Sequence, residues 1–178
     1  GGQLVADGGG GNDADGVLRR YRPMWGTNTS LLIPAFAFAV LDKYYALPAL
    51  SIVENYSDHF VLIHAEIPKY DATTFLINYY GPSGTFRRVK FVDVIDDETL
   101  ATIEEREAEE ANAIDPETNT FSNPDYGLLY DGTFKDKIVL VGSTAPEEHD
   151  LFPVSFARGQ HPGDNLMYGV EIHANVIE

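Results

Sequence analysis

Five side chains in the last third of the sequence are of the types that hold metal ions. Imidazole nitrogens and carboxylate oxygens both suit zinc and similar ions. Their spacing matches no compact zinc motif, and in a helix Glu171 and His173 would lie about 200° apart around the axis. We therefore expect no metal ion, and we expect Asp150 and Glu171 to accept hydrogen bonds from backbone donors or to pair with Arg158. The five residues are His149, Asp150, His161, Glu171 and His173.

Ser143, Asp150 and His173 are also the three residue types of a hydrolytic triad. Many hydrolases hold such a serine in a sharp turn between a strand and a helix, flanked by glycines at fixed positions. That glycine pattern is missing here, and three common residues prove nothing without the required geometry. We therefore expect no catalytic residue, and a metal-dependent or serine hydrolase that uses this region stays open as an alternative function.

Gly142, Ser143 and Thr144 follow the clearest strand-like run of the chain, residues 137–141. A continuous β-branched run of this kind is typical of a strand buried on both faces of a parallel sheet. Open α/β sheets bind ligands at the carboxyl ends of such strands. A phosphate cradle needs a longer glycine-rich loop and often a lysine, so a simple hydrogen-bonded turn is the alternative. We predict that any ligand contacts Ser143, Thr144 and Asp150.

Apolar segments upstream predict the other elements of an α/β fold. Residues 17–22 predict a strand, and residues 32–45 predict a buried helix because their apolar positions recur at helical spacing. Residues 60–64 and 74–80 predict neighbouring strands joined by a short turn, and residues 86–95 predict a third extended segment. We therefore expect a layered sheet of mixed strands with helices packed against it.

The charge balance and the composition exclude several classes of function. A formal net charge of -16, from 28 acidic and 12 basic residues, is unfavourable for binding nucleic acid or anionic lipid. The absence of cysteine excludes disulfides, thiolate metal sites and thiol nucleophiles. No run approaches the roughly 20 apolar residues of a membrane helix. We expect residues 1–16 to be loop or a truncated start, and the acidic residues 97–131 to be a surface insertion.

Three motifs in the last third resemble, in order and spacing, the terminal signature of CHASE2 domains. They read Phe-Lys-Asp-Lys-Ile-Val-Leu-Val-Gly-Ser-Thr-Ala-Pro at 134–146, Asp-Leu-Phe-Pro at 150–153 and Gly-Val-Glu-Ile-His-Ala-Asn at 169–175. The acidic-glycine turn and basic strand at 13–21 is similar to an earlier segment of that family. The segments at 76–82 and 86–95 also fit the family order. The signature residues are Gly142, Gly169, Glu171, His173 and Asn175.

The resemblance implies the later part of an extracytoplasmic α/β sensor domain over residues 17–178, without catalytic activity or cofactor. CHASE2 domains normally belong to bacterial inner-membrane proteins, with membrane helices on both sides and a cytoplasmic nucleotide cyclase, histidine kinase or serine/threonine kinase as output. The implied partners are an unknown small-molecule or environmental stimulus, the protein's own transmembrane helices and output domain, and a second copy in a homodimer. A purely structural dimerisation module stays open as an alternative.

The last segments of the chain predict how such a sensor would respond. Residues 143–165 have the composition of a loop, with several prolines and glycines, and residues 169–177 predict a helix. A long loop of this kind is free to rearrange around rigid elements. We therefore expect a ligand to shift residues 145–168, and the helix to carry the response toward the membrane.

Overall fold

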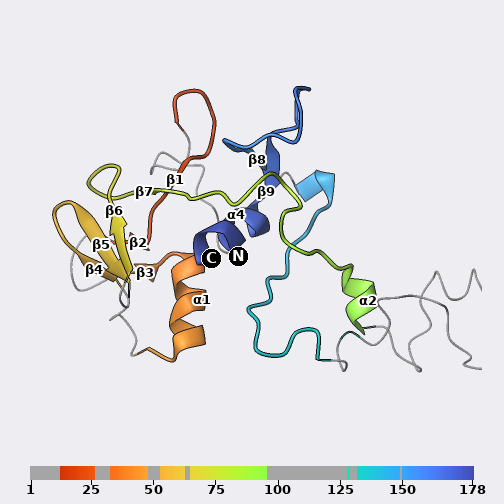
Figure 1. The fold of residues 1–178 in the computed structure, drawn as a ribbon, viewed down its shortest axis with the longest axis horizontal. Helices are drawn as coiled ribbons and strands as arrows, with labels where there is room; N and C mark the ends of the chain where they lie inside the picture. The colour runs from red at the N-terminus through yellow and green to blue at the C-terminus, as the bar shows by residue number, and fades with distance from the viewer. Residues whose placement is uncertain are drawn as a thin grey trace, which may run out of the picture. The chain divides into compact units, whose positions relative to one another are not determined.

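Two compact units make up the chain. The computed structural model describes residues 13–26, 33–47, 53–62, 65–95, 128, 132–148 and 150–178. The first unit consists of Gly1–Phe86 and Leu140–Glu178, and the second of Arg87–Val139. Among the described residues, every helix and strand except the short helix α2 belongs to the first unit (Figure 1). The first unit therefore contains the parts of the fold that position the candidate site.

Strand β1 (Arg20–Tyr21) pairs antiparallel with β7 (Phe75–Leu76), which places Tyr21 opposite Phe75. Just before β1, Leu18 forms a parallel bridge with Val154. The extended segment predicted at residues 17–22 is thus present. The predicted pairing of residues 74–80 with residues 60–64 is wrong, because β7 takes as its partner a strand from much earlier in the chain.

Strands β4 (Val53–Asn55), β5 (His59–Leu62) and β6 (Ala65–Pro68) form a three-stranded antiparallel sheet in chain order. Strands that follow each other closely are favoured partners because closing a short loop costs little entropy. Phe60 of β5 is 1% exposed and belongs to the hydrophobic core, where its ring lies 6.4 Å from that of Phe75.

Helix α1 (Phe36–Tyr45) ends where the sequence predicts but begins later than the predicted start near Leu32. Residues Ile33–Pro34 instead form β3, which pairs antiparallel with β2 (Met24–Trp25). Proline disfavours a helical conformation in the residue before it, so the extended chain continues up to Pro34. The buried face of α1 consists of Ala37, Phe38 and Leu41.

Two segments predicted to be extended differ from expectation. Residues 137–141 form no strand, and Val139 and Val141 are 48% and 76% exposed. A β-branched run becomes a buried strand only where neighbouring strands accept its hydrogen bonds, and this run crosses the boundary between the two units. Within residues 86–95, Phe91–Ile95 forms helix α2, since a short apolar run fits both periodicities. Residues 97–131 lie outside the described residues, except Leu128.

The C-terminal region of the first unit is a hairpin followed by a helix. Strands β8 (Leu151–Pro153) and β9 (Leu166–Tyr168) pair antiparallel, and β9 leads directly into α4 (Gly169–Ile177). The helix has the predicted bounds. The segment predicted as loop, residues 143–165, also contains the 3-10 turn η1 (Pro146–Glu148) and strand β8.

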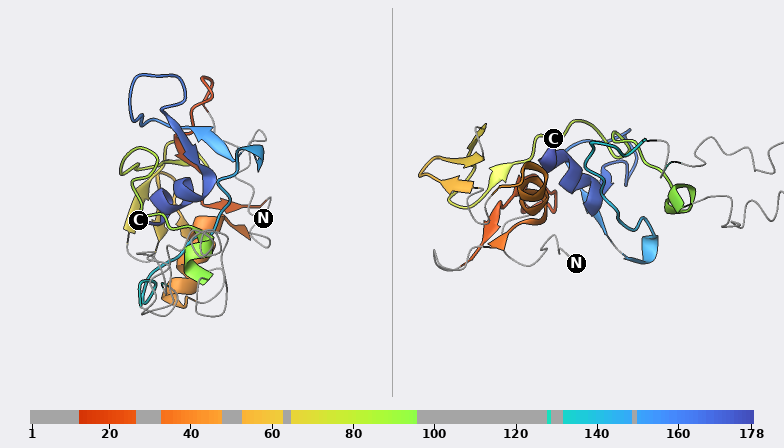
Figure 2. Two further views of the ribbon diagram at one scale, coloured as in Figure 1. Left: turned by 90° about the vertical axis from the view of Figure 1, so that its right-hand side faces the viewer. Right: turned by 90° about the horizontal axis from the view of Figure 1, so that it is seen from below.

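The hydrophobic core of the first unit lies where α1, α4 and β1 meet, and Figures 1 and 2 show α1 and α4 next to each other. The mixture of helices and strands confirms the predicted α/β class, although the described sheets are small and antiparallel. In the described ranges, no helix combines the length and apolar character needed to cross a bilayer. The core residues are Leu18, Tyr21, Ala35, Ala37, Phe38, Phe60, Phe75, Ile77, Tyr79, Val154, Met167 and Ile172.

Candidate functional site

Two of the predicted ligand-binding residues contact the junction between β9 and α4. The backbone carbonyl of Thr144 accepts a hydrogen bond from the Tyr168 hydroxyl at 3.1 Å. The backbone carbonyl of Asp150 accepts one from the amide of Gly169, the first residue of α4, also at 3.1 Å. Thr144 is exposed and Asp150 is half-buried. A ligand contact at these residues stays a prediction, and the structure places both at the start of α4.

Ser143 and Gly142 lie beside the same helix. The Ser143 hydroxyl accepts a hydrogen bond from the Ala145 amide at 3.1 Å, which is the local turn expected as the alternative to an anion site. A Cβ atom added to Gly142 would stand 2.7 Å from Cβ of Val170 in α4. Gly142 therefore allows a close approach of this segment to α4. The segment that contains Ser143 and Thr144 therefore packs against helix α4. The sequence predicted that it would follow a buried strand.

Glu171 uses its buried carboxylate to hold a turn from a distant part of the sequence. Its Oε1 accepts a hydrogen bond from the Gly84 amide at 2.5 Å, and its Oε2 accepts one from the Ser83 hydroxyl at 3.0 Å. Glu171 is 5% exposed, so these donors offset the cost of removing the carboxylate from water. The expectation that Glu171 accepts hydrogen bonds from backbone donors is confirmed.

Asn175 lies one helical turn after Glu171 and holds the same segment. Its Oδ1 accepts a hydrogen bond from the Tyr80 amide at 2.9 Å. Its Nδ2 donates to the Glu171 carbonyl at 2.9 Å and lies 3.5 Å from Sδ of Met167. Asn175 is 3% exposed. Because residues four apart share one face of a helix, Glu171 and Asn175 together fix residues 80–84 against α4.

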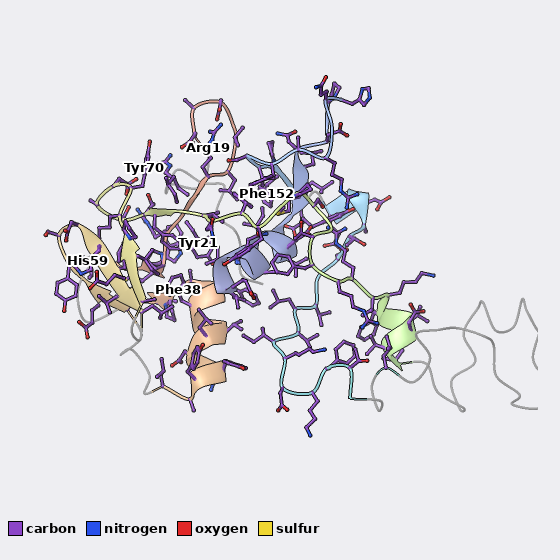
Figure 3. All side chains as sticks on the ribbon, viewed as in Figure 1. Arg19, Tyr21, Phe38, His59, Tyr70 and Phe152 are labelled. Atoms are coloured by element: carbon purple, nitrogen blue, oxygen red, sulfur yellow. The ribbon has the colours of Figure 1, made fainter. Side chains whose placement is uncertain are left out.

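Figure 3 labels Tyr21, which packs beside Phe38 of α1. His173 of α4 contacts a cluster that includes this tyrosine, and we call it the Tyr21 node: Tyr21, Phe36, Ala37 and His173. Its Nδ1 lies 3.1 Å from the Tyr21 hydroxyl oxygen, and its ring centre lies 4.8 Å from that of Phe36. The Tyr21 hydroxyl also accepts a hydrogen bond from the Ala37 amide at 3.3 Å. One phenol oxygen therefore joins β1, α1 and α4.

Tyr21 also completes the N-terminus of α1. The first four amides of a helix have no partner inside it, and Ala35 at the N-cap supplies no side-chain hydrogen bond. The Tyr21 hydroxyl satisfies one of these amides, that of Ala37. Burial raises the pKa of Tyr21 to about 12 and lowers the pKa of His173 to about 4, so both groups are neutral at pH 7.

The residues of the hydrolase alternative have other partners in the structure. The Ser143 hydroxyl bonds the Ala145 amide, whereas His173 is 7% exposed and bonds Tyr21. In the described part of the chain, no three histidine or carboxylate side chains come together in a way that would hold a metal ion. His149 lies outside the described residues.

Sequence reasoning missed the partners of α4, which are Tyr21, Tyr80, Ser83 and Gly84. A signal for them was present. Glu171 and Asn175 are polar residues four apart on one face of the helix, and a buried polar pair needs hydrogen-bond partners from elsewhere. The sequence Gly-Pro-Ser-Gly at residues 81–84 is typical of a turn, and turns leave backbone amides free to act as such partners.

Comparisons with known proteins place the chain in a family. Neither the curated proteins nor the solved structures gave a match. The chain matches the CHASE2 domain over residues 5–178, a range that includes β1, the turn held by Glu171 and the whole of α4. The motif order that resembles CHASE2 domains is thereby confirmed. The chain belongs to the CHASE2 domain family, a family of extracellular sensor domains.

Proposed function

We propose that this chain is the extracytoplasmic input domain of a membrane-bound bacterial signalling protein. The observation that carries the proposal is the set of contacts made by α4, in which three buried polar side chains bind two separate segments, residues 80–84 and strand β1. Glu171 holds residues 83–84, Asn175 holds Tyr80, and His173 holds Tyr21. Because buried and partly buried hydrogen bonds are costly to break, a displacement of either segment acts on α4.

In this proposal α4 passes the response to the protein's own transmembrane helices. The output is a cytoplasmic nucleotide cyclase, a histidine kinase or a serine/threonine kinase, as in other proteins with CHASE2 domains. The domain itself acts by changing conformation and carries out no chemistry. Support comes from the contacts of Ser143 and His173, which satisfy these residues within the fold instead of pairing them for catalysis.

The stimulus acts, in this proposal, on the surface formed by Ser143, Thr144 and Asp150. Support comes from the carbonyls of Thr144 and Asp150, which bond Tyr168 and Gly169 at the start of α4. A ligand changes the equilibrium between two conformations only through contacts that differ between them. A ligand that shifts this surface alters the hydrogen bonds that hold the first turn of α4.

The test uses the full-length protein in membranes, with its cyclase or kinase output measured against a panel of small molecules and environmental stimuli. Thr144→Ala combined with Asp150→Ala should shift the dose response to the active stimulus about tenfold or more, which corresponds to about 1.4 kcal/mol of binding free energy. Glu66→Ala, an exposed position in β6, is the matched control. An unchanged dose response in the double variant would contradict the ligand surface.

A further inference from the structure

The Tyr21 node buries a titratable base that the proposed ligand surface does not use. His173 is 7% exposed, and its Nδ1 lies 3.1 Å from the hydroxyl oxygen of Tyr21. The centres of the two rings lie 5.8 Å apart in an edge-on arrangement. The node joins β1, α1 and α4, so the protonation state of one imidazole affects the packing of all three elements.

The hydrogen bonds of the node favour a neutral His173. The Ala37 amide donates to the Tyr21 hydroxyl oxygen, and in the tautomer that leaves Nδ1 of His173 without a hydrogen, the hydroxyl donates its proton to Nδ1. A protonated imidazole has a hydrogen on both ring nitrogens and accepts none. Protonation of Nδ1 therefore removes the acceptor of the buried hydroxyl proton, and the loss of this hydrogen bond is costly in a low-dielectric core.

The surroundings of His173 from the two helices supply no compensating negative charge. On α1 the ring faces Phe36. On α4 itself, the carboxylate of Glu171 is committed to Ser83 and Gly84. Burial is the cause of the lowered pKa of His173.

Strands β1 and β7 place aromatic rings beside His173 and its partner Tyr21. The titratable group on β1 that faces His173 is Tyr21, whose ring also lies 5.9 Å from that of Phe75 on β7. The cations Arg20 and Arg22 flank Tyr21 in the sequence and point to the opposite face, because side chains alternate along a strand. Arg20 pairs there with Asp71, and Arg22 bonds Thr73.

We propose that His173 is a proton-binding site and that this domain responds to extracellular acidification, when protonation of His173 opens the packing of α4 against β1 and α1. The inference rests on the proposed function as an input domain and adds the proton as a second stimulus, which acts at the Tyr21 node and not at the surface of Ser143, Thr144 and Asp150. In the open state the imidazolium reaches water, and α4 is released from the Tyr21 hydroxyl that also holds the N-terminus of α1.

The direction of the effect follows from the two pKa values of His173. The pKa is about 4 in the closed state and 6.5 in water. Because the closed state binds the proton more weakly, its stability is fully present above pH 6.5 and is lost as the pH falls toward 4. The ratio of open to closed protein should rise about 30-fold between pH 8 and pH 5.

Backbone hydrogen exchange in α4 measures this ratio directly. Protection of the Ile172 and Asn175 amides, corrected for the intrinsic exchange rate, should fall about 30-fold from pH 8 to pH 5 in the wild-type chain. His173→Gln retains an oxygen that can accept from Tyr21 but does not titrate, so it should lack this fall. His59→Gln, which changes a partly exposed histidine of β5 bonded to Asp58, should behave like wild type.

Equal pH dependence in the wild type and His173→Gln would overturn the proposal. If His173→Gln does not fold, the imidazole signals of the wild type decide by nuclear magnetic resonance. A pKa near 4 for the His173 ring in the folded chain supports the proposal, and a pKa near 6.5 refutes it. Such a failure removes the proton as a stimulus and leaves the input-domain proposal to its own test with Thr144→Ala and Asp150→Ala.

Discussion

Replacing Asn175 with alanine removes the hydrogen bonds that tie α4 to the segment after β7. The Tyr80 amide loses its acceptor at 2.9 Å, and the bond from Nδ2 to the Glu171 carbonyl is lost as well. Leaving a buried amide without its acceptor costs about 1–3 kcal/mol, and the lower end of this range applies to the partly buried bond of Tyr80; a typical side-chain hydrogen bond contributes about 1 kcal/mol. Alanine favours a helix over asparagine by about 0.6 kcal/mol. The net loss of unfolding free energy should be about 2 kcal/mol.

Urea unfolding followed by tryptophan fluorescence measures this loss. Trp25 is the single tryptophan of the chain and lies in the same unit as Asn175, so its signal reports that unit. Asn165→Ala is the matched control, because the Asn165 side chain lies at the long distance of 3.5 Å from the Val154 carbonyl. The control should lose less than about 0.5 kcal/mol. If Asn175→Ala is no less stable than Asn165→Ala, then Asn175 does not anchor the segment.

Two further substitutions test contacts around the same core. Tyr79→Phe removes a buried hydroxyl that donates to the Leu18 carbonyl at 2.9 Å. In the same urea assay this variant should lower the unfolding free energy by about 1 kcal/mol. Unchanged stability would show that this hydrogen bond contributes nothing. Gly142→Ala places a Cβ atom 2.7 Å from Cβ of Val170, and it should destabilise the first unit by about 1–3 kcal/mol. A melting temperature equal to that of wild type would mean that the segment moves away from α4 freely.

Local sequence signals predicted the helices α1 and α4 more closely than the strands and their partners. Helix α4 has its predicted bounds, although Val170, Ile172, Ala174 and Val176 alternate with polar residues in a pattern that by itself favours a strand. Residues 137–141 carry an equally apolar pattern and form no strand. The difference is physical, since a helix satisfies its hydrogen bonds internally whereas a strand needs a partner that the sequence does not name.

In the candidate site, the sequence predicted the roles of some residues but not the distant residues that they contact. Residue types and spacing predicted that Glu171 would accept hydrogen bonds from backbone donors, and the motif order pointed to the CHASE2 family. The identity of those donors, at Gly84, was not predicted. Residue types also allowed His173 to serve as a metal ligand or a catalytic base, and only its burial beside Tyr21 showed a neutral core residue.

The sequence by itself determined the family, the helix α4 and the requirement that its polar residues find partners. The tertiary structure decided which partners these are, and with them the charge state of His173. Tyr21 and His173 are 152 positions apart in the chain. Propensity and periodicity act over a few residues, whereas a contact between such distant positions forms only when many segments bury apolar surface together. The pKa of a buried imidazole depends on that shared burial, so no local pattern contains it.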